Sequence, residues 1–252
     1  MPTNRIAMEL PFKITPCPIV ESSLEFRFKS SLPADAIIGV LYTGFSNKGS
    51  SCDLSTLPIA QIPFEIRKQD PNLAYKPTHK LHLNHNNCDA LIGSNVIILT
   101  IPGEYVGWND FFRAISEFLE TLKKIPFIQT IEYVGLRYLN FFPFNIFEKI
   151  NLKIDFKNLN TNAGTVLRTE FNFEDYSAVL QITTGVHLQN ILQKIDADGS
   201  LIDITTVLVG KNIAGITLDN ITDKIQLIHQ GEKELFFSLL TEKYLNELKP
   251  KY

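Results

Sequence analysis

The sequence of 252 residues is poor in the features that mark several large classes of protein. It contains only three cysteines, Cys17, Cys52 and Cys88, without a CxxC spacing, so neither a disulfide framework nor a zinc ribbon is expected. Its most apolar run, residues 96–102, is too short to span a bilayer, and the first twenty residues contain no apolar segment of secretory length. We therefore expect a cytoplasmic protein without a membrane segment.

An excess of positive charge is also missing. The chain has 24 lysines and arginines against 27 aspartates and glutamates, which gives a net charge of -3. The basic residues are scattered, with pairs only at Arg67–Lys68 and Lys123–Lys124. Because nucleic-acid-binding proteins usually gather basic residues on one face, we do not expect a nucleic-acid partner.

Sequence motifs for common catalytic chemistry are absent as well. The chain contains no GxSxG elbow, no GxxxxGK[ST] loop and no HExxH pair, and its glycines do not cluster into a phosphate cradle. We therefore expect no catalytic residue and no cofactor. With 44% hydrophobic and 20% charged residues, the composition is typical of one large globular domain or two closely packed halves.

The first half of the chain, residues 1–148, alternates strand and helix patterns. Apolar residues recur at every second position in the expected strands and at helical spacing in the expected helices. The expected elements are a strand at 18–28, a short helix from Pro33 to Gly44, strands at about 78–84 and 91–101, a helix at 110–124 and a strand at 134–142. This order of strand, helix, strand, strand, helix and strand predicts a ferredoxin-like half.

The second half, residues 149–252, has a different pattern of expected elements. Short strand patterns begin near residue 150 and are separated by turn-forming residues, including ADGS at 197–200, a hairpin signal. A helical pattern follows from about 218 to 247. The sequence therefore predicts an α+β fold in which two antiparallel β-rich halves form one body, the second half being a β-meander with a long C-terminal helix packed on a sheet.

The segment VGLRYLNFF places an arginine and an asparagine in an apolar strand. Because side chains alternate along a strand, Gly135 and Arg137 lie on one face and Tyr138 and Asn140 on the other. Such polar groups need partners when a strand is covered on both sides. Arg137 could pair with an acidic residue of a neighbouring strand, namely Glu21, Glu25 or Glu170, or it could bind a carboxylate or phosphate of a ligand.

The segment HKLHLNHNNC contains four side chains that can bind zinc, namely those of His79, His82, His85 and Cys88. In a strand, however, His79 and His85 share one face and lie about 20 Å apart, while His82 and Cys88 share the other. The spacing therefore favours surface and hairpin-loop histidines, and no metal site is expected.

Three segments together resemble a known family: CPIVESSLEFRF at 17–28, EYVGWNDFFRAI at 104–115 and VGLRYLNFF at 134–142. The resemblance is to a sporadically distributed prokaryotic family of about 250-residue proteins, in which a PPIVEA-type strand, a Y-x-GW-x-x-F helix entry and a GLRY-x-N strand recur. The chain departs from this pattern at Cys17 and Ser22, where the family usually has proline and alanine. The family has no assigned activity, and its patchy distribution would fit an accessory or defence-associated role.

The motif residues are expected to act mainly in the structure. Trp108 and Phe111 are expected to anchor the core, and Gly135 is expected to allow close packing. Tyr105 and Tyr138, which belong to the same motifs, are also expected to have structural roles.

For function, the sequence favours a non-catalytic protein-interaction or sensing module with an unknown protein partner or a homo-oligomer. The alternative is a small-molecule-binding protein or enzyme with a cleft between its sheets, where Arg137 holds an anionic ligand and Glu21 or Glu25 acts as acid or base. Arg27 and Asn140 complete this candidate ligand site. Charged residues of this kind also form cross-strand ion pairs on solvated sheet faces, so both interpretations stay open.

Overall fold

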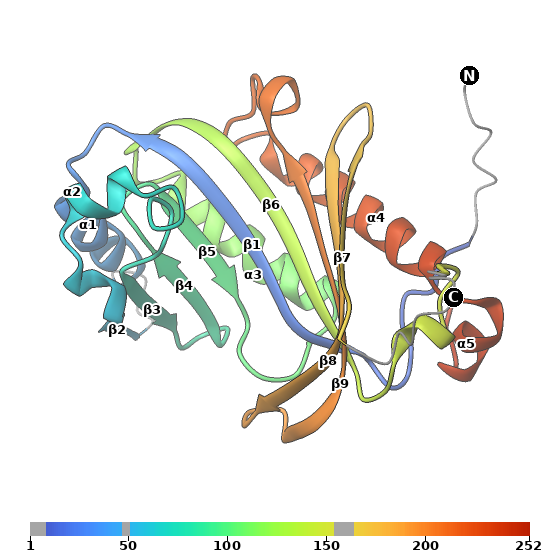
Figure 1. Cartoon of the computed structure of the whole chain (residues 1–252). Coiled ribbons are helices and arrows are strands. Elements are labelled where there is room, and N and C mark those ends of the chain that lie inside the picture. Colours follow the sequence, from blue (N-terminus) through green and yellow to red (C-terminus); the bar gives the residue numbers. More distant parts are fainter. Residues whose placement is uncertain (1–8, 47–50, 154–163) are drawn as a thin grey trace.

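The fold is α+β and contains one large antiparallel sheet (Figure 1). The computed structural model describes residues 9–46, 51–153 and 164–252. Within these residues nine strands pair in the order β2-β3-β4-β5-β1-β6-β9-β8-β7. The strands are β1 (Ile19–Ser30), β2 (Cys52–Thr56), β3 (His79–Leu83), β4 (Cys88–Ile92), β5 (Val96–Thr100), β6 (Ile128–Phe142), β7 (Val166–Asn172), β8 (Ser177–Asn190) and β9 (Ile195–Leu208).

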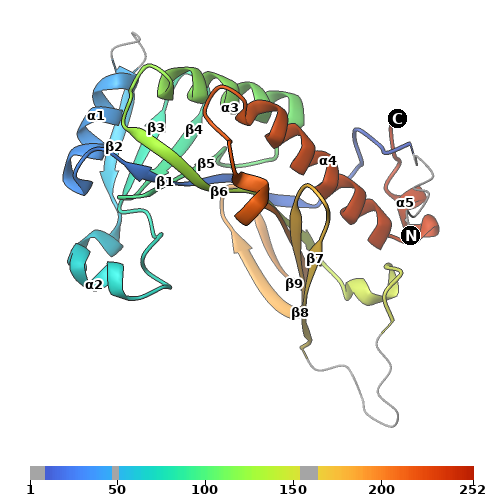
Figure 2. The same cartoon turned by 90° about the horizontal axis from the view of Figure 1, so that it is seen from above.

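The long helices all lie on one face of this sheet. Figure 2 shows α1, α3 and α4 side by side along the same side of the strands. The helices are α1 (Ala34–Ser46), α2 (Phe64–Gln69), α3 (Trp108–Leu122), α4 (Ile221–Leu239) and α5 (Glu242–Glu247). The expected strand at 18–28 and the expected helix at 110–124 are therefore confirmed as β1 and α3, with small shifts at their ends.

The core fills the space between the helices and the sheet. In β1 the alternating residues Leu24, Phe26 and Phe28 are buried on the helix side, as a half-buried strand requires. Two apolar clusters lie along this face, and α4 contributes to both: Ile225 packs in the first and Phe236 in the second. A helix of 19 residues is about 28 Å long, which lets α4 connect the two clusters.

The two halves share the sheet through one strand pairing. β6 pairs with β1 on one side and with β9 on the other, with a register from Val134↔Leu208 to Phe142↔Ser200. The described strands therefore form one continuous sheet, and the cleft between two sheets expected from the sequence has no counterpart among them.

Within the described residues, no long helix covers the opposite face of the sheet. The short helix α2 lies on this side, near the edge of the sheet at β2 (Figure 2). We call this surface the open face.

Two predictions in the first half are wrong in detail. The expected strand at 91–101 is divided into β4 and β5, which form a hairpin through residues 93–95. No strand is expected between Gly44 and residue 78, yet residues 52–56 form the edge strand β2. Short strands with a tight turn present the same apolar density as one long strand, so periodicity alone does not separate them.

The hairpin predicted at ADGS is also wrong. These residues lie inside β9, and the turn between β8 and β9 is at 191–194, where Lys194 has a positive φ of 55°. A side chain at Gly199 would overlap the backbone carbonyl of Phe142. This glycine therefore marks a close approach of two strands rather than a turn.

The single long C-terminal helix is corrected to two shorter ones. α4 ends at Leu239 because Leu240 is extended, with φ -71° and ψ 139°, and forms a β-bridge with Ile150. Thr241 then caps α5, its hydroxyl accepting a hydrogen bond from the backbone N–H of Tyr244. Of the strand expected at 150–156, Ile150 forms the bridge to Leu240 and residues 151–153 form no strand, while the remaining residues lie outside the described ranges.

No helix within the described ranges is long and apolar enough to cross a membrane.

Two glycines in helical surroundings are expected to respond oppositely to alanine. Gly107, directly before α3, has φ +91°, whereas Gly39 is exposed in the middle of α1, and neither has an atom within 4 Å of an added Cβ. We predict that Gly107→Ala lowers the free energy of unfolding by about 1–2 kcal/mol through backbone strain. Gly39→Ala should raise it by about 0.5–1 kcal/mol. Urea unfolding of both variants measures this, and effects of the same sign would contradict it.

Candidate functional site

The open face carries a row of side chains, all but one of them polar, that crosses the described strands of the sheet. Cross-strand partners share a face, so the register places one residue of each strand in this row. From β2 to β7 the row is Asp53, His82, Asp89, Thr100, Ser23, Arg137, Thr205, Val179 and Glu170. Arg137 therefore lies near the centre of the open face, on β6.

Arg137 forms ion pairs with both neighbouring strands. Its Nε donates to both carboxylate oxygens of Asp203 on β9, at 2.9 and 3.0 Å, and one terminal nitrogen donates to Oδ2 at 2.7 Å. The other terminal nitrogen donates to Oε1 of Glu21 on β1, also at 2.7 Å. The guanidinium therefore links three adjacent strands, and two carboxylates already balance its charge.

These contacts raise the pKa of Arg137 above its ordinary value. Burial alone would lower it, but the hydrogen bonds and negative charges of Asp203 and Glu21 outweigh that effect. About a third of the Arg137 side chain, 35%, stays exposed to solvent.

The sequence predicted only part of this arrangement. The pair of Arg137 with Glu21 is confirmed, whereas Glu25 pairs with Arg27. Glu170 pairs with Arg168 on its own strand. Asp203 was missed because its proximity depends on the register between β6 and β9, which no local pattern reveals.

Beside Arg137 the open face is hollowed, with a cavity volume of about 480 Å³. The floor is formed by residues with small side chains, Ser23, Thr100, Gly135 and Thr205, and the larger side chains around it make the wall. The wall residues are Glu21, Glu25, Leu91, Ile98, Tyr133 and Arg137. This surface, which we call the Arg137 hollow, follows directly from small residues meeting on four neighbouring strands.

Arg27 lies at the end of the open face nearer to α2. Its guanidinium carbon is 4.2 Å from the ring centroids of both Tyr75 and Tyr133, and its Nε donates to Glu25 at 2.5 Å. Cation–π contacts of this kind fix a side chain in place. Tyr75 belongs to the segment that follows α2, so Arg27 also holds this segment against the sheet.

Asn140 does not join the other candidate site residues. It is 1% exposed on the helix side of β6, and its side-chain nitrogen donates to the backbone carbonyl of Ile202 at 3.3 Å. Its geometry is that of a satisfied buried amide.

A second polar cluster lies beneath the sheet, where α3 and α4 meet β6. The hydroxyl of Tyr138 is 3.4 Å from that of Tyr105 and 3.4 Å from Nδ1 of His229. The indole of Trp108 stacks on the His229 ring with centroids 3.7 Å apart. Phe111 is fully buried next to Trp108. Trp108 and Tyr138 contact His229 of α4, and Tyr105 contacts Tyr138, so these three motif residues contribute to holding α4.

Two ionisable groups of α4 in this cluster have strongly shifted pKa values. Burial lowers the pKa of His229 to about 3, and the charge of Lys233 adds to this shift. Burial raises the pKa of Glu232, 6% exposed, to about 8, although Lys233 opposes that shift. Both groups are therefore neutral at pH 7 in the folded state. Neither was singled out from the sequence, since they lie within an ordinary amphipathic helix pattern.

The histidine-rich segment has ordinary surface contacts. Nδ1 of His82 is 2.6 Å from a carboxylate oxygen of Asp89, the neighbouring residue in the cross-strand row. Among the residues described here, no group of three or more histidine, cysteine, aspartate or glutamate side chains could hold a metal ion.

A scan against protein-family models finds no match to this chain, and a search of curated proteins finds none either.

Arg137 is expected to contribute to stability through its two acidic partners. We predict that Arg137→Leu lowers the free energy of unfolding by about 1–3 kcal/mol, because it leaves Asp203 and Glu21 without a cation. The effect stays below that of a fully buried pair, since the side chains of Asp203 and Glu21 are 23% and 46% exposed. Urea unfolding measures the change.

Arg168→Leu provides the matched control. Arg168 pairs with Glu170 on the edge strand β7, and both side chains are more than half exposed. Its removal should change stability by less than about 0.5 kcal/mol. Equal effects of the two substitutions would show that Arg137 contributes no more than a surface pair.

The raised pKa of Glu232 predicts a pH-dependent stability. Between the ordinary value of 4.5 and about 8, the unfolded state loses the Glu232 proton while the folded state keeps it, so stability falls as pH rises. Relative to Glu232→Gln, the wild type should lose about 1 kcal/mol per pH unit in this window and level off above it. Urea unfolding at several pH values tests this. A stability difference independent of pH would contradict the assignment.

Proposed function

We propose that the protein is a non-catalytic interaction module that binds a protein partner on its open face. The partner would place a lysine or arginine side chain in the Arg137 hollow. The observation that carries the proposal is that no described helix covers the central strands of the open face, which carries a hollow of about 480 Å³ with an ordered set of charges.

The charge balance of the open face favours a basic partner group. Carboxylates outnumber lysine and arginine side chains on this face, judged by strand alternation from the register. The acidic residues are Glu21, Glu25, Asp53, Asp89, Glu170 and Asp203, and the basic residues are Arg27, Lys29, Lys80, Arg137 and Arg168. Complementary charge of this kind steers association and selects partners.

The hollow itself provides suitable acceptors. Glu21 and Glu25 lie on its wall, and each uses one carboxylate oxygen in its pair with Arg137 or Arg27. The second oxygen of each has no bond to another described side chain, and carboxylates accept several hydrogen bonds. Apolar contacts for the stem of a long basic side chain come from Leu91 and Ile98.

The alternative, an anionic ligand held by Arg137, has less support from this geometry. An incoming anion would have to displace Asp203 or Glu21, both 2.7 Å from the guanidinium, or remain close to their charges. Like charges at such distances repel.

We also propose a ferredoxin-like first half, membership of the resembled family and a cytoplasmic location. A ferredoxin-like first half is supported by the order β4-β5-β1-β6 together with α1 and α3 on one face, β2 and β3 being added at the edge. Membership of the sporadically distributed prokaryotic family, a cytoplasmic location and an accessory or defence-associated role rest on the sequence alone.

The proposal is tested by native mass spectrometry of the full chain isolated gently from its own cells. We expect a stoichiometric protein partner that the double variant Glu21→Gln/Glu25→Gln binds at least about tenfold more weakly, since two charge-assisted contacts are lost. Glu170→Gln, which removes a carboxylate of the same face outside the hollow, should retain the partner.

Two outcomes would contradict the proposal. One is a partner, or a second copy of the chain, that the double variant retains as well as the wild type. The other is a bound small molecule that Arg137→Leu releases, which would favour the alternative function.

A further inference from the structure

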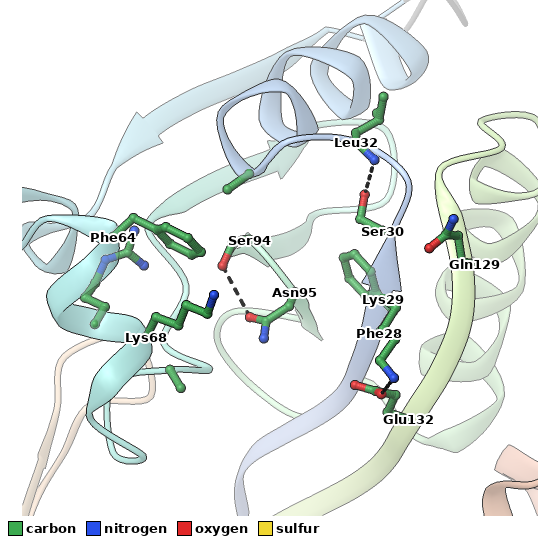
Figure 3. Close-up of a pocket in the computed structure, with 13 residues that line it drawn as sticks. Phe28, Lys29, Ser30, Leu32, Phe64, Lys68, Ser94, Asn95, Gln129 and Glu132 are labelled. Carbon is green, nitrogen blue, oxygen red and sulfur yellow. Dashed lines mark hydrogen bonds and ion pairs between the residues drawn. The ribbon is translucent and has the colours of Figure 1, made fainter.

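A second hollow, at the α2 end of the sheet, has the opposite charge character. It has a cavity volume of about 520 Å³ and lies between α2, the end of β1, the β4–β5 turn and the start of β6. Figure 3 shows Phe64 and Lys68 of α2 on one side, Ser94 and Asn95 of the turn, and Glu132 of β6 on the other side. We call it the Arg67 hollow. A volume of this size is typical of small-molecule sites.

Arg67 is the unusual residue of this hollow. Arg67 is only 9% exposed, yet no carboxylate among the described residues forms an ion pair with it. Its Nε donates to the carbonyl of Ile62 at 3.0 Å, and its guanidinium carbon is 5.8 Å from the Phe64 ring centroid. Neither terminal nitrogen has an acceptor within the part of the chain that the structure describes. Both terminal nitrogens reach solvent, because Oδ1 of Asn86 is the one described side-chain atom that is fully buried without a partner.

An arginine that is mostly buried and lacks an acidic partner is unusual in a folded protein. Lysine and arginine are almost never buried unless they are paired, because burial removes water from the charge. Arg137 follows this rule with two carboxylates, whereas Arg67 does not. The missing partner of Arg67 is therefore expected to come from outside the chain.

The surroundings of Arg67 reinforce its positive charge. Lys68 directs its ammonium group into the hollow towards Ser94 and Asn95, while Lys29 on the wall pairs with Glu132 at 2.9 Å. One acidic residue thus faces three basic ones in a protein whose net charge is -3. The pKa of nearby His79 is lowered, first by burial and second by the charge of Arg67.

The hollow also offers an aromatic surface and hydrogen-bonding groups. The Phe64 ring points into it, and the amide of Asn95 and the hydroxyl of Ser94 lie opposite Lys68 (Figure 3). A planar guanidinium and an ammonium group bind a carboxylate or phosphate, while a phenyl ring accepts a flat or apolar group.

We propose that the Arg67 hollow binds a small organic anion whose phosphate or carboxylate contacts Arg67 and Lys68 and whose apolar part packs against Phe64. This site is separate from the Arg137 hollow and does not depend on the function proposed for it. The two differ in sign, because carboxylates dominate around Arg137 and basic groups dominate around Arg67.

The test uses calorimetric titration of the full chain with four probes. Phenyl phosphate and benzoate combine an aromatic ring with each of the two anions, inorganic phosphate lacks the ring, and benzyl alcohol lacks the charge. We expect saturable binding of at least one aromatic anion, and the tighter of the two identifies the anion class. Inorganic phosphate should bind more weakly, and benzyl alcohol should not bind.

Substitutions place the binding in the hollow. Arg67→Met should weaken the better aromatic anion at least about tenfold, because charged hydrogen bonds are lost. Lys68→Met should weaken it several-fold. Arg168→Met, which removes a distant exposed charge, should leave the affinity unchanged.

The proposal fails if neither aromatic anion binds saturably at millimolar concentration, or if Arg168→Met weakens binding as much as Arg67→Met. Should Arg67→Met not fold, the comparison of Lys68→Met with Arg168→Met decides, since both side chains are exposed. Equal affinities of these two variants would then overturn the proposal.

Discussion

The pairing of β6 with β9 is the constraint on which the rest of the structure depends, because it alone joins the described strands of the two halves. Side chains on both faces of the sheet reinforce it. On the open face Arg137 bonds to Asp203, and on the helix side Asn140 donates to the carbonyl of Ile202. This pairing also places the floor of the Arg137 hollow, since Thr205 reaches that floor only in the observed register.

Much of the fold could be predicted from the sequence, and the failures have local causes. β1 was found because Leu24, Phe26 and Phe28 alternate with polar residues, and α3 was found because its apolar residues recur at helical spacing. The hairpin at ADGS was misplaced because Gly199 signals a turn locally, while in the fold it permits contact with the backbone of Phe142. The terminal helix was overextended because Leu240 continues the apolar pattern although its backbone is extended.

The candidate site around Arg137 could be predicted only where the side-chain alternation of a single strand was sufficient. Strand alternation placed Arg137 and Glu21 correctly, but Asp203 depends on a register set by distant residues. Arg67 gave no signal at all, because an arginine in a short polar helix looks solvated until the neighbouring segments bury it. The two hollows differ in how a partly buried guanidinium is balanced. Arg137 is neutralised by carboxylates of the chain, whereas Arg67 has no counterion among the described residues.

The stacking of Trp108 on His229 has a spectroscopic consequence. The chain contains one tryptophan, so fluorescence excited selectively at the indole originates from a single place, the contact between α3 and α4. An imidazole stacked on an indole changes its emission, and separation of α4 from the sheet would remove that neighbour. The protein therefore carries a natural optical reporter of whether α4 leaves before the strands separate, at the same contact where the pKa of His229 is held low.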